Sequence, residues 1–97
     1  MIGRGHRGRV DANQAEIVAA LRKVGASVVS LARIGEGCPD LLVGYRGRTL
    51  LIEVKDGTAI PSKRLLTEDE LKFQSSWTGA TIRNVGSIEE AIKAISL

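Results

Sequence analysis

The chain of 97 residues is long enough for one domain with a modest core and too short for two. Its hydrophobic fraction of 43% and charged fraction of 26% are those of a soluble globular protein, and its net charge of +3 suits a polyanionic partner without identifying one. The single cysteine excludes an intramolecular disulfide, and the lack of a long apolar run or signal-peptide pattern predicts a cytosolic protein without a membrane segment.

The start of the chain is rich in arginine and in glycine, which disfavours regular structure. We therefore expect residues 1–10 to form a flexible basic arm and residues 11–97 to form one domain. Positive side chains also gather in a polar loop before the second predicted helix. Solvated surface charge is the simpler explanation of such residues, and proximity to an acidic site would favour phosphate binding instead. The candidate nucleic-acid-binding residues are Arg4, Arg7, Arg9, Lys63 and Arg64.

A first helix is expected after the arm. Asp11 is its candidate N-cap, and the helix should run to about Val24 and end at Gly25. Ile17, Leu21 and Val24 recur at helical spacing, which predicts a buried stripe.

Three strands are expected next, near residues 27–33, 40–45 and 49–55. The last two are separated only by a short basic turn at residues 46–48. Such a short connection predicts an antiparallel hairpin.

The second half of the chain carries two capping signals. Thr67 and Glu70 form a capping box for a second helix, and Ser87 and Glu90 repeat that pattern for a last helix. A fourth strand is expected between them, at residues 80–85. The element order α-β-β-β-α-β-α predicts an α/β sandwich with a mixed sheet.

Two acids and a lysine interrupt the apolar predicted strands. Residues two apart in a strand share a face, so Glu53 and Lys55 project together. If the strand that begins at Asp40 pairs with this one, two carboxylates and an ammonium group converge. The alternative is a strand that faces solvent with a weak surface ion pair, but the combination on adjacent strands favours a metal site.

Magnesium and manganese prefer hard oxygen ligands and are usually held by one or two carboxylates with water and substrate phosphate. Asp40 and Glu53 are therefore candidate metal ligands, together with the backbone carbonyl of Val54. Lys55 either helps to deprotonate an attacking water or remains charged and stabilises the phosphate. The sequence does not choose between these two roles.

Three further residues have two explanations each. Glu16 lies at the margin of the buried stripe, so it is either an additional metal ligand, directly or through water, or a surface acid of the helix. Gln74 either supports the metal site or is solvated. Trp77 shares a helix face with Gln74 and is expected in the core.

These motifs occur in a fixed order that covers nearly all of the chain after the arm. They are Glu16, Gly37-x-Pro39-Asp40-Leu41, Glu53-Val54-Lys55, Leu66-Thr67-x-x-x-Leu71-x-x-Gln74-x-x-Trp77, and the run from Gly79-Ala80 to Ser87-Ile88-Glu89-Glu90-Ala91-Ile92. The ordered set resembles the PD-(D/E)XK nuclease superfamily and, within it, the VRR-Nuc family.

The resemblance implies a restriction-endonuclease-like α-β-β-β-α-β core, with a mixed sheet flanked by helices, followed by a C-terminal helix. It also implies a phosphodiesterase that depends on Mg²⁺ or Mn²⁺. The catalytic residues that it implies are Glu16, Asp40, Glu53, Lys55 and Gln74.

Stand-alone members of the family resemble small homodimeric nucleases that cut four-way DNA junctions. We therefore expect a metal-dependent, structure-specific endonuclease that acts on branched DNA as a homodimer, in a bacterial or phage-infected cell. One alternative is a nucleic-acid-binding module without catalysis. Another is a nuclease subunit of a restriction or repair assembly.

Overall fold

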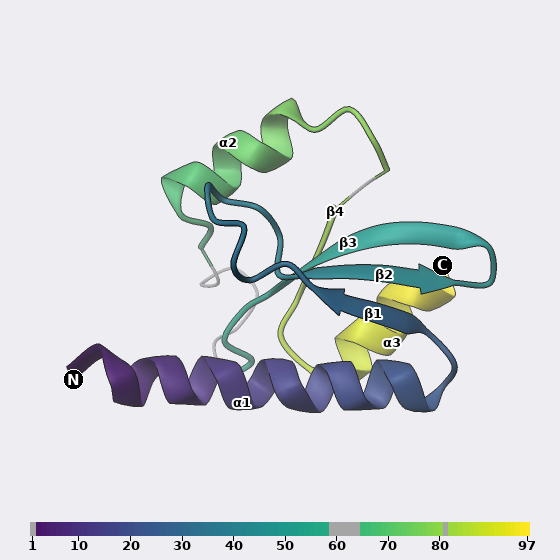
Figure 1. The fold of residues 1–97 in the computed structure, drawn as a ribbon, viewed down its shortest axis with the longest axis horizontal. Coiled ribbons are helices and arrows are strands. Elements are labelled where there is room, and N and C mark those ends of the chain that lie inside the picture. Colours follow the sequence, from purple (N-terminus) through teal and green to yellow (C-terminus); the bar gives the residue numbers. More distant parts are fainter. Residues whose placement is uncertain (1, 59–64, 81) are drawn as a thin grey trace.

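The computed structural model describes residues 2–58, 65–80 and 82–97, with side chains from residue 13 onward (Figure 1). Within these ranges the chain forms helices and strands in the predicted order α-β-β-β-α-β-α, so that prediction is confirmed. The elements are α1 (Ile2–Lys23), β1 (Ser27–Ser30), β2 (Leu41–Tyr45), β3 (Arg48–Val54), α2 (Glu68–Ser76), β4 (Ile82–Val85) and α3 (Ile88–Ser96).

The four strands form one mixed sheet in the order β1-β2-β3-β4. The first three strands pair antiparallel, and β4 lies parallel to β3. The predicted hairpin of β2 and β3 turns through Arg46 and Gly47, which both have positive φ, at 50° and 80°. Two central residues of positive φ are typical of the tight turn that matches the twist of paired strands.

Helices cover both faces of this sheet. Figure 1 shows α1 and α3 along one face, which we call the inner face, and α2 above the other, the outer face. The hydrophobic core lies on the inner face, where alternate residues of the strands meet the two helices. The largest buried core side chains are Ile17, Leu21, Leu41, Val43, Ile52 and Ile95. No helix in the described ranges is both long and apolar enough to span a bilayer.

Helix α1 begins at Ile2, so the prediction that Asp11 starts it is wrong. Nucleation is the costly step of helix formation, and adding a residue to an existing helix requires only propagation. The part of α1 that carries Ile17 and Leu21 is packed in the core and can template the turns before it. The division of the chain into a flexible arm and a domain stays a prediction. Val24, predicted in the buried stripe, lies after the end of α1 and is exposed.

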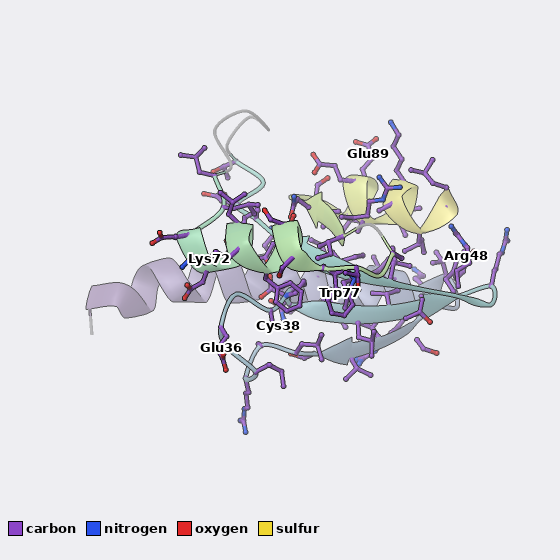
Figure 2. All side chains as sticks on the ribbon, turned by 90° about the horizontal axis from the view of Figure 1, so that it is seen from above. Glu36, Cys38, Arg48, Lys72, Trp77 and Glu89 are labelled. Atoms are coloured by element: carbon purple, nitrogen blue, oxygen red, sulfur yellow. The ribbon has the colours of Figure 1, made fainter. Side chains whose placement is uncertain are left out.

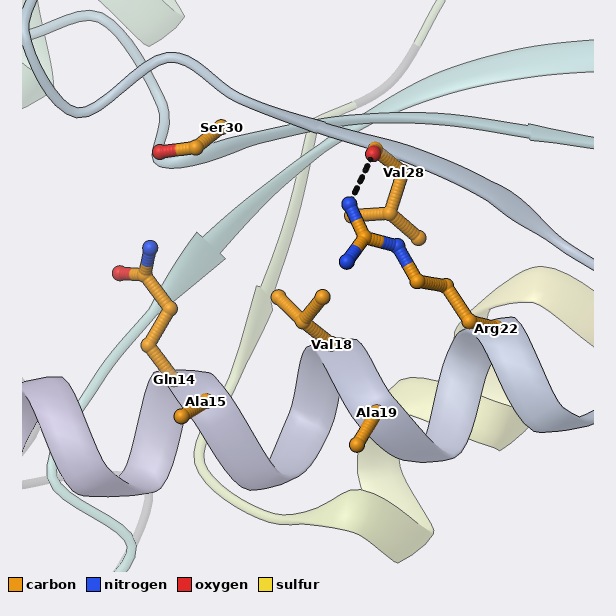
Figure 3. A pocket seen from close by; sticks show the side chains of 7 residues that line it. All are labelled: Gln14, Ala15, Val18, Ala19, Arg22, Val28 and Ser30. Carbon is orange, nitrogen blue, oxygen red and sulfur yellow. Dashed lines mark hydrogen bonds between the residues drawn. The ribbon is translucent and has the colours of Figure 1, made fainter.

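A hollow of about 460 Å³ lies between α1 and β1 on the inner side of the sheet (Figure 3). At one end, the Arg22 guanidinium donates a hydrogen bond of 2.8 Å to the Val28 carbonyl. Because β1 is an edge strand, this contact occupies a carbonyl that could otherwise pair with another strand. The residues that line the hollow include no acid, so it is not where the predicted metal chemistry lies.

Helix α2 has no buried residue. Trp77, which caps its C-terminal end, is 46% exposed, so the prediction that it belongs to the core is wrong (Figure 2). Its ring stacks on Phe73 instead, with centroids 5.3 Å apart. The physical reason is that the outer face beneath α2 carries polar side chains, whereas the core lies on the opposite face.

The loop before β2 packs closely against the first turn of α2. A Cβ atom on Gly37 would lie 2.2 Å from the carbonyl oxygen of Asp69, closer than any real contact. Gly37 also has a left-handed φ of 79°, which favours glycine. This close approach fixes the position of the α2 N-terminus relative to the sheet.

Replacing Gly37 by alanine tests this packing, and Gly35 is a matched control. Gly35 has nearly the same φ, 77°, but a Cβ there would meet no atom within 4 Å. We expect Gly35→Ala to lower the free energy of unfolding by about 1 kcal/mol through backbone strain alone. Gly37→Ala should lower it substantially more, because the methyl group also displaces α2. Urea unfolding measures both variants, and equal losses would contradict the close approach.

Candidate active site

The structure brings Asp40 and Glu53 together on the outer face. Leu41 pairs with Ile52 in the β2–β3 register, so Asp40, one residue before β2, stands opposite Glu53. Side chains of directly opposed residues project to the same face with Cβ atoms about 5 Å apart. Asp40 is also anchored, because its Oδ2 accepts a hydrogen bond of 2.8 Å from the Val54 N–H.

That hydrogen bond also locates the predicted backbone ligand. The N–H and C=O of one strand residue point to the same side of the strand. The Val54 N–H points toward Asp40, so the Val54 carbonyl is directed to the side from which Asp40 approaches. This direction is compatible with an additional oxygen donor, and the role of the carbonyl as a metal ligand stays a prediction.

Glu53 is the buried polar residue of this site, with 3% of its surface exposed. Its Oε1 has no hydrogen-bond partner, and no other buried side-chain oxygen or nitrogen atom in the described residues shares this property. Burial, and after it the neighbouring carboxyl groups of Asp40 and Glu70, together raise the pKa of Glu53 to about 9. A buried acceptor without a partner costs free energy, and a bound cation would remove that cost.

The donor set fits Mg²⁺ or Mn²⁺. Two carboxyl groups and a carbonyl are hard oxygen donors, and one carboxyl oxygen is buried and unpartnered. In the described part of the chain, no three or more His, Cys, Asp or Glu side chains form a complete ligand set. A cation held here would therefore take its remaining ligands from water, from substrate or from the predicted further ligand Glu16.

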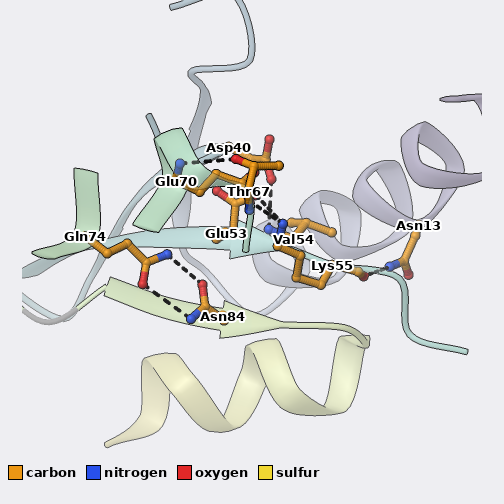
Figure 4. A network of polar contacts seen from close by, with 9 residues as sticks. All are labelled: Asn13, Asp40, Glu53, Val54, Lys55, Thr67, Glu70, Gln74 and Asn84. Atoms are coloured by element: carbon orange, nitrogen blue, oxygen red, sulfur yellow. Dashed lines mark hydrogen bonds and ion pairs between the residues drawn. The ribbon is translucent and has the colours of Figure 1, made fainter. Parts of the chain in front are cut away.

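Lys55 lies beside these acids and contacts two of them. Its Nζ is 3.7 Å from Oε2 of Glu53 and only 2.5 Å from Oε1 of Glu70 (Figure 4). Partial burial would raise the pKa of Glu70, but hydrogen bonds from Lys55 and from the Thr67 N–H hold it below its usual value. The strongest contact of Lys55 is therefore with a residue for which the sequence predicted only helix capping.

The predicted capping box of α2 is confirmed. Thr67 Oγ1 accepts from the Glu70 N–H at 3.1 Å, and Glu70 Oε1 accepts from the Thr67 N–H at 2.9 Å. One carboxyl oxygen of Glu70 thus serves both the helix and Lys55. In the sequence, the capping box explains the presence of Glu70 completely. Its contact with Lys55 was therefore not predicted.

Gln74 does not contact the acids or Lys55. Its amide group pairs with that of Asn84, which accepts at 2.8 Å and donates back at 3.4 Å. Asn84 stands opposite Glu53 in the β3–β4 register, so this amide pair borders the site. A catalytic role for Gln74 stays a prediction.

Glu16 is exposed on α1, and its described side chain makes no hydrogen bond or ion pair in the structure. Its role as a metal ligand stays a prediction. The residues predicted to bind nucleic acid have side chains outside the described part of the structure, namely Arg4, Arg7, Arg9, Lys63 and Arg64.

Two other residues of the site were not predicted. Asn13 of α1 donates hydrogen bonds to the backbone carbonyls of Lys55, at 2.9 Å, and Gly86, at 3.4 Å, and thereby ties α1 to the ends of β3 and β4. Cys38 lies close enough to the acids for burial, Glu53 and Asp40 to raise the pKa of its thiol. A raised pKa keeps the thiol protonated, which disfavours nucleophilic chemistry.

The fold agrees with a comparison of known structures. A solved structure described as "VRR_NUC domain" is 28% identical to this chain and superimposes with a TM-score of 0.67, over 91% of this chain and 95% of that one. Comparisons of the sequence with protein-family models and with curated proteins give no match. The structural likeness covers most of the chain, and it supports a nuclease-type domain.

The raised pKa of Glu53 predicts how stability depends on pH when divalent metal is absent. The folded-state pKa, about 9, lies above the ordinary value of 4.5, so between these values the folded chain holds a proton that the unfolded chain releases. The free energy of unfolding should therefore fall as pH rises through this window, by up to ~1.4 kcal/mol per pH unit from this group. Glu53→Gln should remove this loss and be more stable than the natural chain, increasingly so at higher pH.

Urea unfolding in the presence of a chelator, at several pH values across this window, measures the effect. Glu89→Gln, on the exposed surface of α3, is the matched control and should follow the natural chain (Figure 2). Parallel pH profiles for Glu53→Gln and the natural chain would contradict the buried protonated carboxyl.

Proposed function

We propose that this chain, which belongs to the VRR-Nuc family, is a metal-dependent endonuclease that hydrolyses phosphodiester bonds in branched DNA. The observation that carries the proposal is the carboxyl group of Glu53. It is buried, has an oxygen without a partner, stands opposite Asp40 and lies beside Lys55. Burial of such a group without a partner lowers the stability of the fold, and a bound cation would supply the missing partner.

Asp40, Glu53 and the Val54 carbonyl would hold Mg²⁺ or Mn²⁺, with Glu16 as a further ligand directly or through water. When bound, the cation lowers the pKa of a coordinated water and neutralises charge on the phosphodiester. The Asp40 carboxylate is already oriented by the Val54 N–H. Lys55 lies next to Glu53 and either holds the attacking water or stabilises the charged phosphate.

DNA is the expected partner of a nuclease domain. In the proposed complex, Arg4, Arg7 and Arg9 contact the phosphate backbone from one segment and Lys63 and Arg64 from another. The same proposal places the enzyme in the cytosol, where it meets its substrate.

Homodimerisation follows from the proposed junction substrate. The chain measures 40 × 30 × 26 Å, and its described residues form one candidate site. Two related cuts in a symmetric four-way junction require two related sites, and a pair of subunits with twofold symmetry supplies them.

Substitution of the two acids tests the proposed chemistry. Asp40→Asn keeps an acceptor for the Val54 N–H but removes the charge, and Glu53→Gln removes the buried carboxylate. We expect each to reduce the rate of cleavage of labelled DNA in Mn²⁺ by roughly 10²–10³-fold, because charge stabilisation in the transition state is lost. Glu89→Gln is the control and should cleave like the natural chain.

Unimpaired cleavage by either acid variant would exclude the proposed site. Salt-sensitive DNA binding without cleavage in any divalent cation would instead favour the binding-module alternative.

The substrate and the oligomeric state are tested together. We expect four-way junctions to be cut faster than flap, duplex or single-stranded DNA of the same sequence, and light scattering after size exclusion to give the mass of two chains. A junction preference by a monomer would contradict the twofold arrangement. Activity that requires an added protein would favour the assembly-subunit alternative.

A further inference from the structure

We infer that Glu70 is a positioning residue for Lys55, and that it holds the ammonium group closer to itself than to the proposed metal ligand Glu53. This inference rests on the proposed nuclease function and adds a residue to its site. Glu70 acts through Lys55 and is not among the proposed metal ligands, although its carboxyl group also lies beside that of Glu53.

The distances give the first argument. Lys55 Nζ lies 2.5 Å from Glu70 and 3.7 Å from Glu53, so the closer acid is the one outside the proposed ligand set. A charge-assisted hydrogen bond of this length is strong and fixes direction. Both partners are largely buried, with side-chain exposures of 14% for Lys55 and 17% for Glu70, which limits competition from water.

The consequence for Glu53 gives the second argument. Its Oε1 is buried and unpartnered although an ammonium group lies nearby. Without Glu70, the ion-pair partner that remains for Lys55 is Glu53, and a closer contact there would compete with a cation. Glu70 therefore leaves the carboxyl group of Glu53 available while Lys55 remains beside it.

The support of Glu70 gives the third argument. The Thr67 N–H donates to the same oxygen that contacts Lys55, and this fixes the carboxyl group. The backbone of α2 is fixed in turn by Gly37, where an added Cβ would lie 2.8 Å from the Glu70 nitrogen. Capping geometry and loop packing thus set the position of the Lys55 ammonium group.

Glu70→Gln separates the charge of this residue from its capping role. Glutamine also forms capping boxes at this helix position, so α2 keeps its N-cap while the ion pair is lost. The matched control is Glu90→Gln in the first turn of α3, where Glu90 Oε1 accepts from the Gly86 N–H. Thr67→Ala is the converse variant, because it removes the capping hydroxyl and leaves the Glu70 carboxylate.

We expect Glu70→Gln to reduce kcat for junction cleavage by about 10–100-fold with little change in KM. Losses of this size are typical of residues that orient the groups around a metal without binding it. Glu90→Gln should retain the natural rate. Thr67→Ala should lose more thermal stability than Glu70→Gln but less activity.

A double-substitution cycle with Lys55→Gln identifies the route of the effect. If Glu70 acts through Lys55, Glu70→Gln causes no further loss of rate in the Lys55→Gln background. Mn²⁺ affinity, measured by calorimetry without DNA, is the second readout. Glu70→Gln should weaken it several-fold in the natural chain and have little effect once Lys55 is replaced.

A natural rate for Glu70→Gln, or an equal loss in both backgrounds, would overturn the inference and leave the proposed function intact. If the natural chain binds Mn²⁺ but cleaves no DNA, the proposed function fails. The Mn²⁺ affinities of the single and double variants then test the inference about Glu70. A natural chain that does not bind Mn²⁺ overturns both.

Discussion

Burial of the Glu53 carboxyl group is the constraint on which the rest of the outer face depends. An unpaired carboxylate in such a place costs several kcal/mol, and a protein reduces that cost by protonation or by a nearby cation. The structure shows both, because the pKa of Glu53 is raised to about 9 and Lys55 lies 3.7 Å away. Asp40, Glu70 and α2 are arranged around this one group.

The sheet register determines which side chains share that face. A shift of one residue in the β2–β3 pairing would send every side chain of one strand to the opposite face and separate Asp40 from Glu53. The two-residue turn at Arg46 and Gly47 prevents such a shift, because its positive φ angles close the hairpin in one register. A turn at one end of the hairpin thus determines the chemistry at the other.

The hairpin and its acids were predictable because strand alternation and short turns are local signals. Contacts between segments that are distant in the sequence could not be predicted in this way. Glu70 had a complete local explanation as a capping residue, and nothing in the sequence indicates that the same oxygen also contacts Lys55. The exposure of Trp77 was missed for a related reason, since helical spacing does not reveal which face of the sheet holds the core. The predicted start of α1 was wrong because a helix that is already packed extends easily, even into residues of weak helix propensity.

The attachment of α2 links stability to the proposed activity. This helix buries none of its own residues, and its contacts with the outer face include the pairs Glu70–Lys55 and Gln74–Asn84. Elements with little buried apolar surface contribute little to global stability and open locally at low cost in free energy. The same polar groups that hold α2 over Glu53 also set the electrostatics of the candidate site. Replacing them with apolar residues would strengthen the fold at the expense of the site, which is the usual conflict between stability and function in an active site.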